Sequence, residues 1–557
     1  MDQYNVQLWV KMEPFLVGAL QLPPPSKFSM HYLRKMSSYV RTRANDGCYP
    51  RLSWTMWRHI ACGKLQLAED IAWLYFEVFD SLKQTTEQRL EWAEAMSSCK
   101  SEEEFEKLKS TLSVDTLQFF LFLYIQQLNK VSLRSSVMGD EWPSPRIKSP
   151  SPEFSGKANC QYKNWDDYSH LSFILTHLAD LLELLLDPDQ LTASCHSTHS
   201  SLLSLKAIHV LGFLIEGTVD KNRTVHLLQE LALWQPLQVK SGFSKISKTF
   251  SLYKLQTWLK ESLIMNPFGT SACIKSGKKL AWAQQVEGTT KRAKVACNPC
   301  TVPEGHHMVV MSQVYRQTVA KSSETLVGAH VKIYQCNESF IYLLSPLRSV
   351  TIEKCRNSTF ILGPVQMAVH VQSCENIKVI AISYRLSISS TTSCTLHILT
   401  PTRPLILSGN QNLILAPFHT YYPMLEDHMA KAGLATIPNN WDNPLLMCAE
   451  TSATKSIWRV QSPREFYVFV IPFEMEGDTM EIPGGLPSAY QKAMRHREQR
   501  IQLWQKTVKE ASLTREQRKQ FQALVEHKFN EWLIQTGNRQ QLDSLVPPQV
   551  GSKQVAG

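Results

Sequence analysis

Three segments in the second half of this chain repeat one another at a fixed spacing of 19 residues. Each segment places a polar residue between two apolar ones and reaches a cysteine shortly afterwards; the segments are Val331–Cys336, Val350–Cys355 and Val369–Cys374. Two further apolar columns keep the same spacing: Ile341, Phe360 and Val379, and Leu343, Leu362 and Ala381. Apolar residues that alternate with polar ones have the period of a strand. A repeat of about 20 residues built from such strands predicts a right-handed parallel β-helix, whose coils stack to bury their apolar edges.

The region around these repeats also carries the motifs of a known family. The motifs are Gly363-Pro364-Val365, Val369 with Val371, Cys374 with Asn376, Leu386, Thr402-Arg403-Pro404 and Ala416-Pro417-Phe418. Together they resemble the C-CAP domain of tubulin-folding cofactor C, which has relatives in the X-linked retinitis pigmentosa protein and the cyclase-associated proteins. This resemblance implies a C-CAP β-helix over residues 306–435. For the cofactor C group it also implies activation of GTP hydrolysis by tubulin or by Arf-like GTPases.

The resemblance places the family's catalytic position on a residue that carries no charge. In the cofactor C group an arginine in a Gln-Gln-Leu-Arg run acts on the GTPase, and counting forward from Cys374 without gaps puts this run on Tyr384-Arg385-Leu386-Ser387. The leucine matches, but the arginine position is Ser387. A serine hydroxyl cannot stabilise the charge on a transferring phosphoryl group, which is a contribution of roughly 10³–10⁵ in rate. The resemblance therefore implies no catalytic residue and no enzyme activity here.

Arg385 is the substitute candidate for this role. Residues two apart in a strand point to the same side, so Arg385 faces the same way as Ser387. Its side chain would start about 6–7 Å from the usual origin along the strand. Such a displacement removes much of the effect of a positioned catalytic group. The alternative function is thus a GTPase-activating protein for tubulin or Arf-like GTPases that uses Arg385.

The N-terminal half resembles one branch of the same family, through Trp9–Leu20 and Trp57–Leu65. That resemblance implies a non-catalytic, cytoskeleton-associated adaptor in the cytoplasm, located at the centrosome or microtubule organising centre and at the spindle pole. It implies effects on centrosome and Golgi positioning, cell shape and migration. The implied partners are proteins, either centrosomal or related to tubulin or Arf-like GTPases.

Composition and periodicity divide the chain into seven parts. Helical apolar periodicity occurs in Leu65–Leu82, Leu117–Leu128, Leu171–Leu186, Leu202–Ile215, Val225–Leu233 and Tyr253–Leu263. We expect an N-terminal helical domain (1–135), a Ser/Pro-rich linker (136–164), a helical domain (165–267), a basic linker (268–305), the β-helix (306–435), an extension with a strand at Phe466–Ile471 (436–482), and basic amphipathic helices with a tail (483–557). The sequence leaves open whether the two helical regions pack as one unit. It also leaves open whether the Ser-Pro pairs at Ser144, Ser149 and Ser151 are phosphorylated or form a passive spacer.

Charge and cysteine usage narrow the classes of partner and cofactor. The net charge is +10 with 59 Lys and Arg against 49 Asp and Glu, and no nucleic-acid fold signature accompanies it, which favours acidic proteins over nucleic acid. No apolar run reaches the roughly 20 residues that cross a bilayer, so we expect no membrane insertion. Cysteines in a β-helix column are typical of a reducing compartment. Cys297 and Cys300 have zinc-site spacing without a second ligand pair, so the sequence predicts no metal and no cofactor.

The C-terminal helices have an apolar face on a basic background. That face consists of Phe521, Leu524, Val525, Phe529, Trp532 and Leu533. Thr514 to Gln517 has the form of a capping box at the start of this helix. We expect the face to pack against the β-helix, the alternative being that it docks in a groove of a partner.

Overall fold

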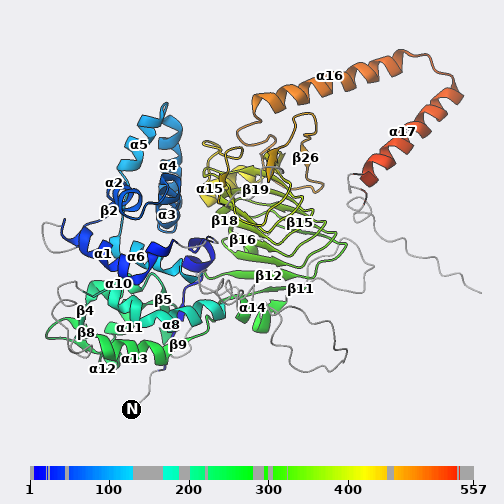
Figure 1. Ribbon diagram of the computed structural model, residues 1–557. Helices are drawn as coiled ribbons and strands as arrows, with labels where there is room; N and C mark the ends of the chain where they lie inside the picture. The colour runs from blue at the N-terminus through cyan, green and yellow to red at the C-terminus, as the bar shows by residue number, and fades with distance from the viewer. Residues whose placement is uncertain are drawn as a thin grey trace, which may run out of the picture. The chain divides into compact units, whose positions relative to one another are not determined.

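The computed structural model describes residues 5–20, 22, 25–43, 49–128, 167–186, 201–219, 224–279, 294–298, 305–322, 324–447, 457–535 and 539. The expected linker at 136–164, with its Ser-Pro pairs, lies outside these residues. The chain divides into two compact units (Figure 1). The first unit contains residues 1–85, 98–277 and 298–307, and the β-helix unit contains residues 86–97, 278–297 and 308–557.

The first unit is mainly helical. Its α-helices are α1 (Met30–Arg41), α2 (Trp54–Arg58), α3 (Glu69–Ser81), α5 (Glu102–Ser110), α6 (Thr116–Ile125), α8 (Asp167–Leu184), α10 (Leu205–Leu211), α11 (Leu228–Leu233), α12 (Gln238–Ser241), α13 (Leu252–Ser262) and α14 (Thr270–Ser276). Short π- and 3₁₀-helical turns lie at Pro14–Gly18, Ser26–Phe28, His59–Lys64 and Gln235–Leu237. Every residue of α6 is buried, as its apolar character on all sides predicts. Phe119 of α6 packs edge to face against Phe79 and Trp57.

A small sheet joins the two helical regions into this single unit. Its strand order is β6 (His226–Leu227), β5 (Ile215–Val219), β1 (Val6–Val10) and β9 (Leu263–Ile264). The N-terminal strand β1 pairs antiparallel with β5 and parallel with β9. Residues before and after the 136–164 segment therefore share one sheet, which answers the question that the sequence left open. The unit also holds the pair β2 (Leu52–Ser53) and β3 (Ser113–Val114), and a sheet of β4 (Leu202–Ser204), β8 (Thr249–Ser251) and β7 (Phe243–Ser244).

Two of the expected helices are wrong in part. The segment Leu202–Ile215 begins as strand β4, forms α10 and ends as β5, and Val225–Leu233 begins as β6 before α11. The hydroxyl of Ser204 accepts a hydrogen bond from the Ala207 amide and starts α10 there, and Gly212 ends it. Gly217, which looks like a helix stop in the sequence, lies inside β5. A Cβ atom at this glycine would come within 2.5 Å of the Gln7 carbonyl oxygen, so glycine allows β1 to approach.

The β-helix has the predicted parallel register. One wall contains β12 (Met308–Ser312), β14 (His330–Tyr334), β16 (Leu347–Glu353), β18 (Val365–Gln372), the second half of β19 (Lys378–Ser389) and β21 (Leu405–Ile406). The opposite wall contains β13 (Thr318–Lys321), β15 (Phe340–Leu343), β17 (Thr359–Leu362), the first half of β19, β20 (Thr395–Leu399) and β22 (Leu413–Pro417). Val331, Val350 and Val369 are register partners, and so are Ile341, Phe360 and Val379. All six are at most 2% exposed, so the predicted columns form the core.

The cysteine column lies at the corners between the two walls. The number of residues between equivalent positions of successive turns changes after this column. Cys336, Cys355 and Cys374 point into the core between two residues with positive φ in each turn, such as Gln335 and Glu338. The next step, from His370 to Ser387, is 17 residues. In the earlier turn Gly363 and Pro364 separate β17 from β18, whereas β19 runs through both walls without interruption. One residue is lost at this junction, since Val365 pairs with Ser383, and a second at a bulge before Ala368, which pairs with Arg385, so the spacing shortens from 19 to 17 residues along β19.

Both ends of the β-helix are covered by further strands. At the first end β10 (Lys278–Lys279) and β11 (Lys294–Cys297) extend the sheet antiparallel to β12, so this part of the expected basic linker is folded. The reason is that Val295 and Cys297 alternate into the core. At the other end β24 (Leu445–Leu446) and β25 (Trp458–Val460) pair with β21 and β22. The strand expected at Phe466–Ile471 is shorter than predicted, because only β26 (Phe469–Val470) pairs there, with β23 (Thr420–Tyr421).

Among the described residues, four α-helices complete the β-helix unit: α4 (Thr86–Ser98), α15 (Leu425–Ala432), α16 (Ser488–Glu510) and α17 (Arg515–Gln535). The capping box of α17 is confirmed, because the Thr514 hydroxyl accepts from the Gln517 amide and the Gln517 side chain accepts from the Thr514 amide. The expected packing of the α17 apolar face is wrong. Of its six residues Leu533 is buried and Phe521 is half-buried, whereas Leu524 and Phe529 are 56% and 52% exposed. Phe521 instead lies against Trp504 of α16, with ring centres 5.9 Å apart.

Candidate functional site

The candidate site is the outer surface of the first wall where β18 and β19 pair. In this parallel pair Arg385 lies opposite Ala368, and Ser387 lies opposite His370. Leu386 and Ile388, which alternate with them, are fully buried in the core. Arg385 and Ser387 therefore share the outer face of the wall, as the strand period predicts.

Ser387 is held by a histidine on the neighbouring strand. The Oγ atom of Ser387 lies 2.6 Å from Nδ1 of His370, and the serine is 7% exposed. The same arrangement occurs two turns away, where Nδ1 of His330 lies 2.7 Å from Oγ of Ser349. Because the histidine–serine pair recurs between register partners on this wall, it is a way of satisfying polar groups on the sheet surface. The Ser387–His370 pair is therefore not a catalytic dyad that distinguishes this site from the rest of the wall.

Arg385 is buried beside an aromatic ring that also contacts an arginine of α4. Arg385 is 1% exposed, and its Cζ atom lies 5.7 Å from the centre of the Tyr384 ring. The Cζ atom of Arg89 lies 5.1 Å from the same ring. Both distances are within the range of cation–π contacts. The guanidinium charge of Arg385, the substitute candidate, is thus enclosed in the protein.

Helix α4 is fixed to this wall through its buried face of Arg89, Trp92 and Ala93. The Arg89 guanidinium donates to the carbonyl oxygen of Gln366 and to Sδ of Met367. At the start of α4, Thr86 lies against Gly433, which ends α15 with φ +66°; a Cβ atom at this glycine would come within 3.0 Å of the Thr86 carbonyl oxygen. Sequence reasoning missed α4 as part of the site. Its helix is largely polar, and the burial of a single arginine leaves no periodic signal.

Residues 328–445, from just before β14 to β24, match the family model described as tubulin binding cofactor C. TBCC domain-containing protein 1 of Homo sapiens is 71% identical over 558 residues, covering 100% of both chains, and the Bos taurus protein gives the same values. The Danio rerio protein of that name is 57% identical over 99% of this chain and 95% of its own. The chain belongs to the TBCC domain-containing protein 1 family.

In this member of the TBCC domain-containing protein 1 family the matched region contains Arg385 and Ser387, while α4 comes from outside it. Within the described residues there is no group of three His, Cys, Asp or Glu side chains that could hold a metal ion. Cys297 is buried in the β-helix core, and Cys300 lies outside the described residues. No helix among those described is long and apolar enough to span a membrane.

Two buried histidines of the TBCC domain stack on each other on the opposite wall. The rings of His397 and His419 stack in parallel with their centres 3.5 Å apart. Burial, and then the nearby positive charge of Lys378, lowers the pKa of His397 to about 3. Burial also lowers the pKa of His419, with further contributions from His397 and Lys378, and burial lowers the pKa of Lys378 itself. Both histidines are therefore neutral near pH 7 and serve packing.

The cysteine column of the domain has the character of buried thiols. Burial, followed by contacts with its two neighbours in the column, raises the pKa of Cys355 well above its usual value. The Cys336 thiol lies at the end of the column, where a hydrogen bond with Cys355 lowers its pKa. None of the eight cysteines in the described residues, these among them, forms a disulfide.

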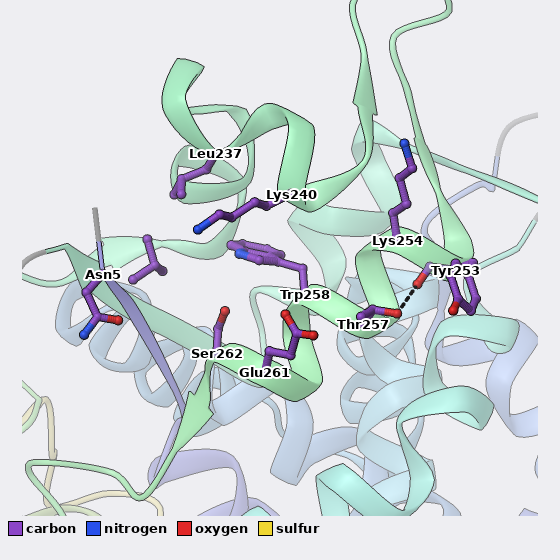
Figure 2. A pocket seen from close by; sticks show the side chains of 10 residues that line it. Asn5, Leu237, Lys240, Tyr253, Lys254, Thr257, Trp258, Glu261 and Ser262 are labelled. Carbon is purple, nitrogen blue, oxygen red and sulfur yellow. Dashed lines mark hydrogen bonds between the residues drawn. The ribbon is translucent and has the colours of Figure 1, made fainter. Parts of the chain in front are cut away.

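Outside the TBCC domain, the first unit has a cavity of about 380 Å³ beside α13 (Figure 2). Trp258 forms its floor, and Lys240, Lys254 and Glu261 stand around it. Thr257 at its rim donates to the Tyr253 carbonyl oxygen. The charges of this cavity are mixed in sign, and its polar groups do not converge on one point, so it does not define a ligand class.

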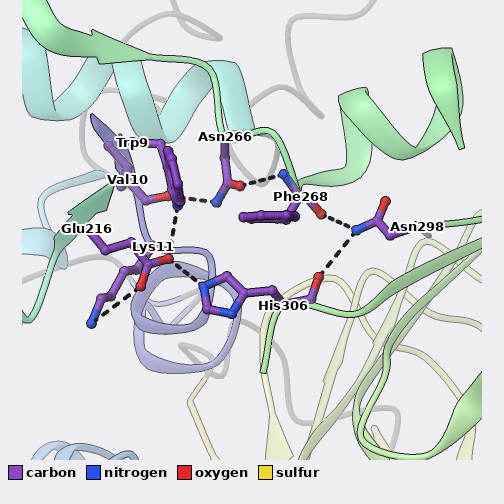
Figure 3. Close-up of polar contacts among 8 residues, drawn as sticks. All are labelled: Trp9, Val10, Lys11, Glu216, Asn266, Phe268, Asn298 and His306. Atoms are coloured by element: carbon purple, nitrogen blue, oxygen red, sulfur yellow. Dashed lines mark hydrogen bonds and ion pairs between the residues drawn. The ribbon is translucent and has the colours of Figure 1, made fainter. Parts of the chain in front are cut away.

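A polar cluster in the first unit holds strands together (Figure 3). Glu216 of β5 accepts from Nε1 of Trp9 at 2.9 Å, lies 2.6 Å from Nε2 of His306, and pairs with Nζ of Lys11 at 3.7 Å. Burial opposes ionisation of Glu216, but His306, Lys11 and Trp9 together outweigh it and lower the pKa of the carboxyl. Asn298 donates to the carbonyl oxygens of Phe268 and His306. The cluster is fully engaged within the unit and is a structural one.

Proposed function

We propose that this chain is a non-catalytic, cytoskeleton-associated adaptor with tubulin-related protein partners. The proposal rests on the charge and the burial of Ser387 and Arg385, the two candidate residues on the β18–β19 wall. Ser387, at the position of the family's arginine, carries no charge and is hydrogen-bonded to His370. Arg385 is 1% exposed beside Tyr384, so its guanidinium has no path to a nucleotide held by a partner.

A rigid parallel wall supports a binding role without catalysis. An arginine that acts in the transition state contributes mainly to the chemical step and little to association. A wall that lacks this arginine can therefore keep its affinity for a partner. The matched family, tubulin binding cofactor C, supports tubulin or a tubulin-related protein as that partner.

The proposed place of action is the cytoplasmic cytoskeleton, at the centrosome or microtubule organising centre and the spindle pole. The proposed consequences are centrosome and Golgi positioning, with effects on cell shape and migration. This part of the proposal is supported by the resemblance of the N-terminal half, which extends to the full length of the chain in its relatives. Proximity labelling from the full-length protein in cells tests it. A labelled set rich in centrosomal proteins supports the adaptor, and a set dominated by Arf-like GTPases contradicts it.

The second candidate is a GTPase-activating protein for tubulin or Arf-like GTPases. One observation favours it: Arg385 occupies the same outer face of the wall as Ser387. For this role Arg385 would have to leave the Tyr384 ring and become exposed. A partner that rearranged the surroundings of Tyr384, including the Arg89 contact, would supply that change.

A further inference from the structure

Helix α16 forms one side of a groove of about 830 Å³ in the β-helix unit. The groove is lined by Arg464, Lys492, His496, Arg497, Arg500 and Trp504, together with two smaller apolar residues of the helix. Figure 1 shows α16 as a long helix following the strands that end the β-helix. Five of the lining side chains are basic and none is acidic.

The walls of the groove are fixed by contacts of Arg497 and Tyr490. Arg497 donates to the carbonyl oxygens of Phe466 at 2.6 Å and Arg464 at 2.7 Å. Its Cζ atom lies 4.0 Å from the centre of the Tyr467 ring. The Tyr490 hydroxyl donates to the Gln461 carbonyl oxygen, and its ring packs on Phe466. The helix and the 461–467 segment therefore keep a concave shape between them.

The positive charges of Lys492 and Arg500 on the groove are unneutralised. Lys492, His496 and Arg500 are exposed and four residues apart, which places successive side chains about 6 Å apart along one face of the helix. Among the residues that the structure describes, no carboxylate is within ion-pair distance of Lys492 or Arg500. Beside them lie Ile501 and Trp504, which are 48% and 50% exposed. The surface thus combines a row of basic side chains with an apolar strip.

We propose that this groove binds an acidic, amphipathic polypeptide segment of another protein. Carboxylates four residues apart on a helical segment have the same spacing as Lys492, His496 and Arg500. A leucine or phenylalanine of that segment covers Ile501 and Trp504. A membrane surface is flat and does not fill a concave groove. A nucleic-acid backbone matches the cations but has no apolar group for Ile501. This surface is separate from the β18–β19 wall, so the inference does not depend on the proposed adaptor function.

The test uses the full-length chain and a short fluorescein-labelled helical peptide. The peptide has glutamate at every fourth position and leucine beside each glutamate, and binding is followed by fluorescence anisotropy. Lys492→Glu with Arg500→Glu should weaken binding by about tenfold or more, because two attractive charges become repulsive. Trp504→Ala should weaken it as well. Arg495→Glu is the control: it makes the charge change of one of these two substitutions at an exposed position of α16 outside the groove, and should change the affinity by less than about twofold.

Three results would overturn the proposal. The first is equal binding of the same peptide with lysine in place of glutamate. The second is an unchanged affinity in the Lys492→Glu, Arg500→Glu protein with circular dichroism and melting temperature like the wild type. The third is tighter binding of oligothymidylate or of phosphatidylserine vesicles than of the acidic peptide, with loss in the same variant, because the groove would then serve a nucleic acid or a lipid surface.

Discussion

The Arg89 guanidinium of α4 and the Tyr384 ring of β19 are stacked, with Cζ 5.1 Å from the ring centre. Tyr384 is the first residue of the four that align with the catalytic run of the cofactor C group, and Arg385 lies against the same ring. Helix α4, which is remote in the sequence, thereby contacts β19, the strand at the position of the family's catalytic arginine. This contact and the Ser387–His370 hydrogen bond together account for a wall that keeps its shape without exposing a positive charge.

The β-helix core depends on Phe360. This side chain is fully buried between its register partners Ile341 and Val379. Phe360→Ala should lower the free energy of unfolding by ~3–5 kcal/mol, because it removes buried apolar surface and leaves a cavity. Urea denaturation followed by tryptophan fluorescence measures this. Thr351→Ala, at a half-buried outer position of the wall, is the control with a small effect. Equal stability of the Phe360→Ala protein would show that the column is not core.

Stability should fall in mild acid because of His397. Its pKa is about 3 in the folded state and near 6.5 when exposed. Above about pH 6.5 both states are neutral there; as pH falls toward 3 the unfolded state binds the proton and the folded state does not, so folding loses stability by up to about 1.4 kcal/mol per pH unit. His397→Phe keeps a ring against His419 and removes this titration. Denaturation midpoints at about pH 7.5 and about pH 5 should therefore differ less in the variant than in the wild type. An identical pH dependence in both proteins would contradict the buried neutral histidine.

The cysteine column should react slowly with alkylating reagents under native conditions. Cys355 and Cys374 are at most 2% exposed, and a buried thiol with a raised pKa, as at Cys355, has little thiolate. Cys99, which is half-buried, is the internal reference and should be labelled first. Peptide mass spectrometry after a short exposure to iodoacetamide gives the order. Labelling of the column as fast as that of Cys99 would remove the assignment of these cysteines to the core.

The sequence predicts the repeating part of the fold best, because repetition makes each apolar column visible several times. Spacing alone predicts that Val350 and Phe360 lie in the core, and the structure confirms this position for both residues. The fold of the first unit was less predictable, since β1 pairs with β5 across about two hundred residues and neither strand has a long alternating run. Gly217 has no local signal for the same reason: its role is to admit a strand that is remote in sequence. Of the candidate site, the shared face of Arg385 and Ser387 follows from the strand period, whereas the stacking of Arg89 on Tyr384 has no local signal.

The central claim is that the β18–β19 wall does not accelerate GTP hydrolysis, and a multiple-turnover GTPase assay tests it most directly. The assay measures phosphate release by tubulin and by Arf-like GTPases with the wild-type chain, Ser387→Arg and Arg385→Ala. The wild type should give little or no stimulation, and Arg385→Ala should behave like it, because the Arg385 guanidinium is buried. Ser387→Arg places a charge at the family's position and should be the one variant able to stimulate hydrolysis. Strong stimulation by the wild-type chain that disappears in Arg385→Ala would contradict the adaptor and make Arg385 the catalytic residue.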